Sequence, residues 1–291
     1  MVTKDKTGVA LKEQAGLPAE YAGLEEYAGQ GLDELDSSDR SVPFLKVLEK
    51  NSPEIETVDG AKPGMIIDTA TLKLYDSIRF VPATREHSFV EWVPIDNGGG
   101  LVASYGMDTP IAKWAAGQRG KISLKNGNDL VETFYLFGIL LPEEGDDEGE
   151  PKPVVIAFTS TRIKTYKSIV NRSDSIMLMG ANNRKFKAPW FCHVWRIGTL
   201  KKVDGAQSWY IFTAEFDSPN KDANGARLPA EHPAVQLGAA LVEQKRDGSL
   251  KMAQESSGMD QPDTGNDGTA QPGTGGGNKG GYKPDPEDPP F

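Results

Sequence analysis

Two apolar runs on either side of a short acidic segment constrain the fold of this chain most. The first run covers 132–141 (ETFYLFGILL) and the second covers 153–159 (PVVIAFT). Both runs are short and rich in aromatic and β-branched residues, which favours strands in the interior of a sheet over helices. The segment between them, 143–150, carries six acidic residues. We therefore expect a pair of central strands joined by an exposed acidic hairpin loop.

Further strands and two helices are expected around this pair. Aromatic and β-branched runs bounded by turn residues predict the strands, which cover 78–82, 88–93, 101–103, 190–197 and 208–216, with a hairpin turn at 203–206. Apolar residues recur every three or four positions between 160 and 179, which predicts an amphipathic helix capped by Ser160 or Thr161. A second helix is predicted at 233–246. The fold class is therefore mainly β (α+β), with one or two helices.

The chain divides into three segments by composition. Residues 1–40 are polar and irregular and are expected to be a flexible N-terminal segment. Residues 41–252 contain neither an internal repeat nor a Pro/Ser-rich linker, which favours one domain. Residues 253–291 are rich in Gly, Pro, Asp and Thr and have too little apolar surface to offset their ordering entropy. They are expected to form a disordered acidic tail.

The chain shows no targeting or membrane signal. Its first residues carry charges and no apolar run, so no signal peptide is expected. No segment reaches the ~20 apolar residues that a membrane-spanning helix needs. We expect a soluble, cytoplasmic protein with no membrane partner, located in the host cell cytoplasm if it is phage-encoded.

The charges of the chain are segregated, and the formal net charge of −10 conceals this. Between 161 and 202 there are ten Lys or Arg and a single acid, Asp174. The acidic charges concentrate at 143–150 and at 255–291, where seven acids face two lysines. A basic region beside acidic regions is typical of nucleic-acid binders, although each run alone could be a solvated surface.

Motifs of enzymes and metal sites are absent from the sequence. The three histidines are far apart, and the single cysteine excludes an internal disulfide and a Cys-rich zinc site. Cys192 and His193 are adjacent, so on a strand they would point to opposite faces and form a poor nucleophile–base pair. We expect no enzyme activity, no catalytic residue, no metal and no cofactor. A site assembled from distant carboxylates would leave no motif.

Cations and aromatic residues alternate in the basic stretch 161–202. Binding of a single strand needs cations along the phosphates and aromatic faces for the bases. The densest piece, 184–187 (RKFK), is flanked by Gly180 and Pro189 and is expected to be a loop. The candidate nucleic-acid-binding residues are Arg162, Lys164, Tyr166, Lys167, Arg172, Arg184, Lys185, Phe186, Lys187, Trp190, Trp195 and Arg196. Some of these aromatic residues are expected in the core, since Trp190 and Trp195 would face opposite ways on one strand.

The final residues, 285–291 (DPEDPPF), have a composition typical of a docking element. A terminal Phe preceded by three acids has no folding role in a disordered tail, so a partner with an apolar pocket and cations is expected. The candidate partner-binding residues are Asp285, Glu287, Asp288, Pro290 and Phe291.

This ending resembles the acidic tails of single-stranded DNA-binding proteins, and the whole chain resembles a phage-encoded member of that class. Residues 42–65 also resemble a set of phage proteins. The resemblance implies an OB-fold-like β-barrel core and a tail that binds polymerases, helicases or nucleases.

The sequence thus predicts a non-catalytic, non-sequence-specific single-stranded DNA-binding protein of phage replication or recombination. Its expected partners are single-stranded DNA and, through the tail, replication or recombination proteins; it is a possible homo-oligomer. Two alternatives are a phage structural or scaffold protein whose tip docks in an assembly, and a nuclease or recombination enzyme with a dispersed carboxylate site.

Overall fold

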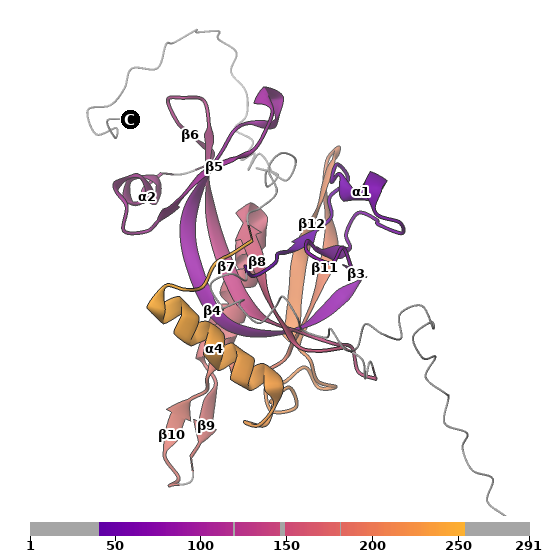
Figure 1. Ribbon diagram of the computed structural model, residues 1–291, viewed down its shortest axis with the longest axis vertical. Helices are drawn as coiled ribbons and strands as arrows, with labels where there is room; N and C mark the ends of the chain where they lie inside the picture. Colours follow the sequence, from indigo (N-terminus) through magenta and orange to yellow (C-terminus); the bar gives the residue numbers. More distant parts are fainter. Residues whose placement is uncertain (1–40, 119, 146–148, 181, 254–291) are drawn as a thin grey trace, which may run out of the picture. The chain divides into compact units, whose positions relative to one another are not determined.

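Two long antiparallel strands, β4 (Ser77–Trp92) and β7 (Asp129–Leu141), form the centre of the fold (Figure 1). The structure is a computed structural model, and it describes residues 41–118, 120–145, 149–180 and 182–253. All described residues belong to one unit that begins at Ser41. The expectations for the N-terminal segment 1–40 and for the tail residues 254–291 lie outside the described residues.

The main sheet branches at both ends of this central pair. One edge of β4 pairs with β11 through 77–80 and with β5 through 88–92, while its other edge pairs with β7. The free edge of β7 likewise pairs with β8 through 133–140 and with β6 through 129–130. The flanking strands are β5 (Leu101–Gly106), β6 (Ile122–Ser123), β8 (Lys152–Thr159), β11 (Trp195–Asp204) and β12 (Gln207–Phe216). Strand β12 pairs only with β11 among the described strands.

The expected strands at 78–82 and 88–93 are one continuous strand. Pro82 has no backbone N–H to donate to the ladder, which is why the sequence indicated an end there. The register shifts between Pro82 and Thr84, so a bulge at this point carries the strand past the proline. The expected pairing of the two apolar runs is confirmed, because Thr133–Leu140 pairs antiparallel with Lys152–Thr159.

Helices cover the two faces of the sheet. Side chains of β7 alternate, so that Phe134 and Leu136 belong to one core cluster and Tyr135 and Phe137 to another. The first cluster includes Tyr166 of α3 (Ile163–Asp174), and the second includes Leu241 of α4 (Pro233–Asp247). Figure 1 shows α4 lying across the sheet. The helix expected at 233–246 is confirmed.

The helix expected at 160–179 is shorter than the apolar pattern indicated. A 3-10 turn, η4 (Ser160–Arg162), precedes α3, and neither Ser160 nor Thr161 caps the helix with its side chain. The helix ends at Asp174, because the next apolar residues form the strand β9 (Met177–Met179). Ser160 instead has a left-handed backbone, with φ of 47°, as the chain leaves β8.

Short strands, short helices and 3-10 turns make up the rest of the described fold. The strands β1 (Leu45–Val47), β2 (Ile66–Asp68) and β3 (Leu74–Tyr75) form a three-stranded sheet, and β9 pairs with β10 (Lys185–Lys187). The helices are α1 (Glu54–Thr57) and α2 (Pro110–Ala115), with 3-10 turns η3 (Ile95–Asn97) and η5 (Trp190–Cys192). The segment 190–197, expected to be one strand, therefore begins with η5, and β11 starts only at Trp195.

The expected fold class is confirmed as α+β and mainly β. The described strands do not close into the barrel that the resemblance implied. Phe44, directly before β1, forms a single parallel bridge with Val155 of β8, and β1 forms no ladder with β12. In the described part of the chain, no helix is long and apolar enough to cross a membrane.

Candidate nucleic-acid interface

The basic stretch 161–202 spreads over α3, the β9–β10 hairpin, η5 and β11. The hairpin contains 184–187, which the sequence predicted to be a loop. It is a two-stranded ribbon because Met177, Leu178 and Met179 pair with Lys187, Phe186 and Lys185 in register. Figure 1 shows this hairpin projecting from the sheet and its helices.

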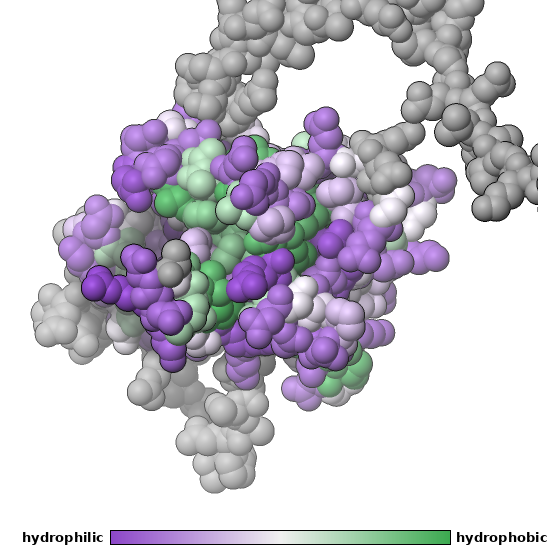
Figure 2. Space-filling view, turned by 90° about the horizontal axis from the view of Figure 1, so that it is seen from below, coloured by the Kyte–Doolittle hydropathy of each residue, from purple (hydrophilic) through white to green (hydrophobic). Residues whose placement is uncertain are grey.

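The β9–β10 hairpin presents cations and apolar side chains to solvent. Directly paired residues share a face, so Lys185 and Lys187 lie on one face with Met177 and Met179, and Phe186 lies on the other with Leu178. Phe186 is 45% exposed, although a large aromatic side chain is normally buried. Polar residues surround a central apolar area on the side from which the hairpin projects (Figure 2).

The outer face of α3 adjoins this hairpin. Lys164 and Lys167 are exposed on α3, and Arg184 and Lys185 are exposed at the hairpin. None of these four cations forms an ion pair with another described residue. One ion pair joins the hairpin to the end of α3, since Lys187 Nζ lies 2.6 Å from Asp174 Oδ1, and the Ala188 amide closes the base of the hairpin by donating to the Ile176 carbonyl at 2.9 Å. We call the exposed side of α3 and the hairpin, with these four cations, the α3–hairpin surface.

Arg162 joins separate parts of the fold and is not a free cation. Its Nε donates to the Tyr210 carbonyl at 3.0 Å, and its Nη2 binds the Glu49 carboxylate. The guanidinium also lies over the Phe212 ring, 5.9 Å from its centroid. The Glu49 carboxylate accepts from the Tyr210 amide as well, at 3.3 Å. This cluster ties the chain after β1 to β12 and to the start of α3.

Arg172 and Arg196 also have partners within the fold. The Arg172 guanidinium stacks over the rings of Trp195 and Phe216, at 4.9 and 4.5 Å from their centroids. Arg196 Nη1 lies 2.7 Å from both carboxylate oxygens of Glu143, and its Nε lies 3.1 Å from Asp217 Oδ1. Although burial lowers it, the pKa of Arg196 rises above its usual value because of these two acids.

The Arg196 cluster explains part of the acidic loop. Arg79 of β4 binds Asp217 at 2.7 Å through Nε and Glu144 at 3.4 Å through Nη2. The first two acids of 143–150 therefore lie against two arginines. The loop expectation for 146–148 lies outside the described residues.

The candidate aromatic residues separate into core and surface. Tyr166 is 2% exposed, stacks on Phe134 at 4.7 Å between centroids, and accepts from Arg85 through its hydroxyl. Trp195 is completely buried, so a base cannot stack on either ring. Trp190 is partly buried against the same core cluster. Of the candidate aromatic residues, Phe186 alone is classed as exposed in the described part of the chain.

Cys192 and His193 do meet, contrary to the expectation from strand geometry. Cys192 ends η5 instead of lying in a strand, and its Sγ is 3.2 Å from His193 Nδ1. Both side chains are buried. Burial raises the pKa of the Cys192 thiol, and burial together with Arg227 lowers the pKa of His193. Both shifts disfavour a thiolate–imidazolium pair.

Sequence reasoning missed the acids that engage the candidate cations. Glu49 lies 113 positions from Arg162, and Asp217 lies 138 positions from Arg79. No local motif signals pairs at such separations; the only hint was an excess of acids in the folded segment. Among the described residues, no group of three or more His, Cys, Asp or Glu side chains could hold a metal ion.

Comparison with known proteins gives the family of this chain. A family model described as Pam3 phage gp34-like protein matches residues 12–231, which is most of the chain. No curated protein and no solved structure gives a significant match. The match runs through the sheet, α3, the β9–β10 hairpin and β12, and stops just before α4. The chain belongs to the Pam3 phage gp34-like protein family.

Proposed function

We propose that this phage protein binds single-stranded DNA without sequence preference and without catalysis, in phage replication or recombination. The observation that carries the proposal is the α3–hairpin surface. It presents four cations that are free of ion pairs with described residues, and the exposed ring of Phe186, which follows one of them, Lys185, in sequence. Cations attract the phosphates, and an exposed ring offers a stacking face to any base.

The surrounding charges support this choice of surface. The other arginines of the basic stretch, Arg162, Arg172 and Arg196, already bind acids, carbonyls or rings of the fold. The acidic residues Glu143 and Glu144 lie against Arg79 and Arg196 and not against the hairpin. A phosphate chain would therefore meet the least repulsion along α3 and the hairpin.

Single strands suit this surface better than a specific duplex site. Sequence readout in the major groove needs side chains that form bidentate hydrogen bonds with base edges. Lysines predominate here, and Lys acts as a point charge with no fixed fork geometry. A single exposed ring is suited to an unpaired base, which a duplex does not offer.

The tail has a separate place in the proposal, on the basis of its sequence. Residues 255–291 carry seven acids and end at Phe291, so they are suited to recruit replication or recombination proteins that offer cations and an apolar pocket. Deleting 256–291 should leave strand binding by the folded part intact and abolish capture of such partners. Loss of strand binding in the deletion variant would contradict this division of roles.

A salt-series titration tests strand binding directly. The full chain is titrated against labelled oligo-dT and a matched duplex, from ~50 to ~300 mM salt. Each phosphate contact to a single strand contributes about 0.7 to the slope of log affinity against log salt. The combined variant Arg184→Gln, Lys185→Gln removes the two free cations of the hairpin and should lower this slope by about 1.4.

The matched control removes two exposed cations elsewhere, Lys50→Gln and Lys113→Gln, and should leave the slope unchanged. No tight single-strand binding at ~50 mM salt would overturn the proposal. An unchanged slope in the hairpin variant would move the site to another surface.

A second candidate rests on the apolar residues of the same hairpin. Met177 and Met179 are 52% and 60% exposed, and polarizable methionines are common on protein-binding surfaces. This favours a structural or scaffold role in which the hairpin docks on another phage protein. Tight oligo-dT binding that Met177→Ser and Met179→Ser leave unchanged would argue for the first candidate.

A further inference from the structure

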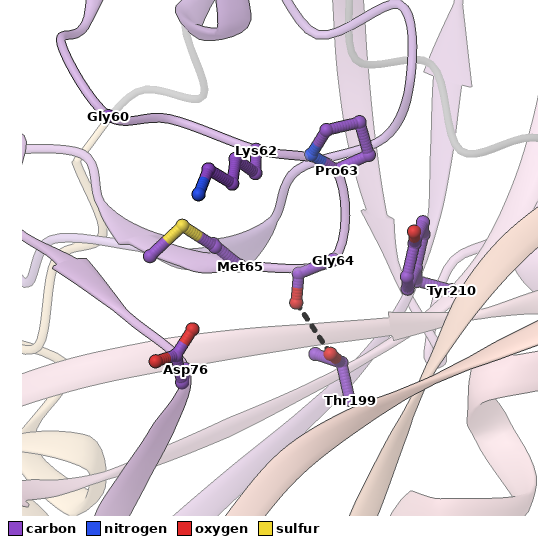
Figure 3. A pocket seen from close by; sticks show the side chains of 8 residues that line it. All are labelled: Gly60, Lys62, Pro63, Gly64, Met65, Asp76, Thr199 and Tyr210. Carbon is purple, nitrogen blue, oxygen red and sulfur yellow. Dashed lines mark hydrogen bonds between the residues drawn. The ribbon is translucent and has the colours of Figure 1, made fainter.

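A hollow lies between the chain before β2 and the β11–β12 hairpin, and the proposed function does not use it. Its volume is about 370 Å³, and we call it the β2–β12 notch. The side chains that border it come from three parts of the chain (Figure 3). They are Lys62, Pro63, Met65, Asp76, Thr199 and Tyr210.

Hydrogen bonds and close packing around Gly64 hold the two walls of the notch in place. Thr199 Oγ1 donates to the Gly64 carbonyl at 2.5 Å, and the Gly64 amide donates to the Leu48 carbonyl at 2.7 Å. A Cβ at position 64 would lie 2.4 Å from Tyr210 Cε1, and the φ of Gly64 is +95°. Only glycine therefore allows the loop to pass this close to the ring.

Three of the side chains that border the notch have polar ends without a partner among the described residues. Lys62 and Asp76 form no ion pair with a described residue, and no described residue hydrogen-bonds to the Tyr210 hydroxyl. Lys201 lies directly opposite Tyr210 in the β11–β12 register and is exposed. Their Cβ atoms are thus about 5 Å apart on the same face. Lys62, Asp76 and the Tyr210 ring therefore border the notch, and Lys201 lies beside Tyr210 on the neighbouring strand.

The notch continues the α3–hairpin surface at the other end of α3. Arg162, directly before α3, holds the Tyr210 carbonyl, and Thr165 in its first turn donates to the Phe212 carbonyl at 2.6 Å. Lys164 is exposed on the same turn. A strand that follows the cations of α3 would therefore meet the notch where β12 adjoins the helix.

We propose that the β2–β12 notch holds one unpaired nucleotide of the bound strand, an inference that rests on the proposed function. The base lies against Tyr210, and the phosphates on either side meet Lys62 and Lys201. Asp76 disfavours a bare phosphate by charge repulsion, and it accepts a hydrogen bond from the amino group of a cytosine or adenine. A nucleotide is the ligand class that carries an anion, a donor and a flat ring together.

Crosslinking and affinity measured on the full chain test this inference. The combined variant Lys62→Glu, Tyr210→Leu should bind oligo-dC about 10 to 100 times more weakly at ~50 mM salt, because one phosphate contact and one base contact are lost. Lys113→Glu makes the same charge reversal on α2 and should change the affinity less than twofold. An oligonucleotide with photoreactive 5-iodocytosine should crosslink to the peptide that contains Tyr210. Tyr210→Phe keeps the ring and should bind as the wild type does.

The outcomes separate this inference from the proposed function. If the wild-type chain binds no oligonucleotide, both fall together. If it binds, and the variant at Arg184 and Lys185 is weaker while the notch variant is unchanged, the notch inference alone is overturned. Crosslinks confined to the β9–β10 hairpin overturn it as well. Circular dichroism and an unfolding curve confirm that each variant is folded.

Discussion

Arg162 and Arg184 belong to the same basic stretch, yet they differ in their exposure to solvent and in their partners. Arg162 has a side chain only 18% exposed and binds the Glu49 carboxylate and the Tyr210 carbonyl. Arg184 stands exposed beside Phe186 on the β9–β10 hairpin, without an ion pair among the described residues. The difference arises because α3 packs on the core while the hairpin projects from it. The cations between 161 and 202, where the net charge is +9, therefore fall into two groups. One group stabilises the fold, and the other is available to a ligand.

The largest expected effect contrasts a buried ring with an exposed one. Trp195→Ala should lower the free energy of unfolding by about 3–5 kcal/mol, because it leaves a cavity where a fully buried indole packed. Phe186→Ala should change it by less than about 0.5 kcal/mol, since the ring is 45% exposed and belongs to none of the buried core clusters. Urea unfolding of both variants measures this. Equal losses in the two variants would break the comparison.

The same contrast applies to the cations. Arg162→Met should cost about 2–3 kcal/mol of unfolding free energy, because it leaves the partly buried Glu49 carboxylate without its cation and removes the hydrogen bond to Tyr210. The control Lys164→Met, two positions along the chain, should cost less than about 0.5 kcal/mol. If Lys164→Met proved the more destabilising of the two, the assignment of Arg162 to the fold would be wrong.

Strand binding should show the reverse pattern. Phe186→Ala should weaken the binding free energy for oligo-dT by about 1–3 kcal/mol while leaving stability intact, because one stacking face is lost. Phe186→Trp supplies a larger face and should restore the affinity. Anisotropy titration at fixed salt measures both variants. Unchanged affinity in Phe186→Ala would remove the hairpin ring from the site.

The smallest expected effect concerns acid pH. Asp68 is fully buried; burial raises its pKa, but the hydrogen bonds from Lys152 and from the backbone of Ala70 outweigh this and lower the pKa below 3.8. The pKa of Asp68 is therefore lower in the folded state than in the unfolded state. The contribution of Asp68 to the free energy of unfolding is present above its unfolded pKa and is lost as the pH falls through its folded pKa.

Asp68→Asn should therefore lose about 1–2 kcal/mol at pH 7 and show a shallower decline between about pH 4 and 2. Unfolding curves at a series of pH values measure this. The control Asp76→Asn, at an exposed position, should change the free energy of unfolding at pH 7 by less than about 0.5 kcal/mol. Equal losses at pH 7 in both variants would remove Asp68 from the group of charges that stabilise the fold.

Local patterns predicted most strands and both long helices but not their limits. The apolar period placed α3 correctly, since Tyr166 and Ile169 are buried as the stripe required. It could not indicate that Met177–Met179 leave the helix, because three apolar residues fit a strand equally well. Pro82 indicated a strand end, and only the bulge that pairs it with β7 shows that β4 continues.

The sequence predicted what kind of site this is, but it did not predict correctly which residues form it. The sequence named twelve residues, of which Tyr166 and Trp195 lie in the core and Arg162, Arg172 and Arg196 bind other parts of the fold. Tyr210 and Lys62, which border the notch, carried no signal of their own. They lie 148 positions apart and meet only because β12 passes beside the chain before β2.

The sequence by itself determined the class of this protein: a mainly β fold, an amphipathic basic helix, and charges segregated along the chain. These follow from side-chain period and composition, which are local properties. Only the tertiary structure decided which cations remain free, because an arginine loses its availability to a ligand when a distant carboxylate or ring is brought against it. It also decided that 184–187 stands out as a hairpin, since that depends on pairing with β9 and on the absence of a core beneath it.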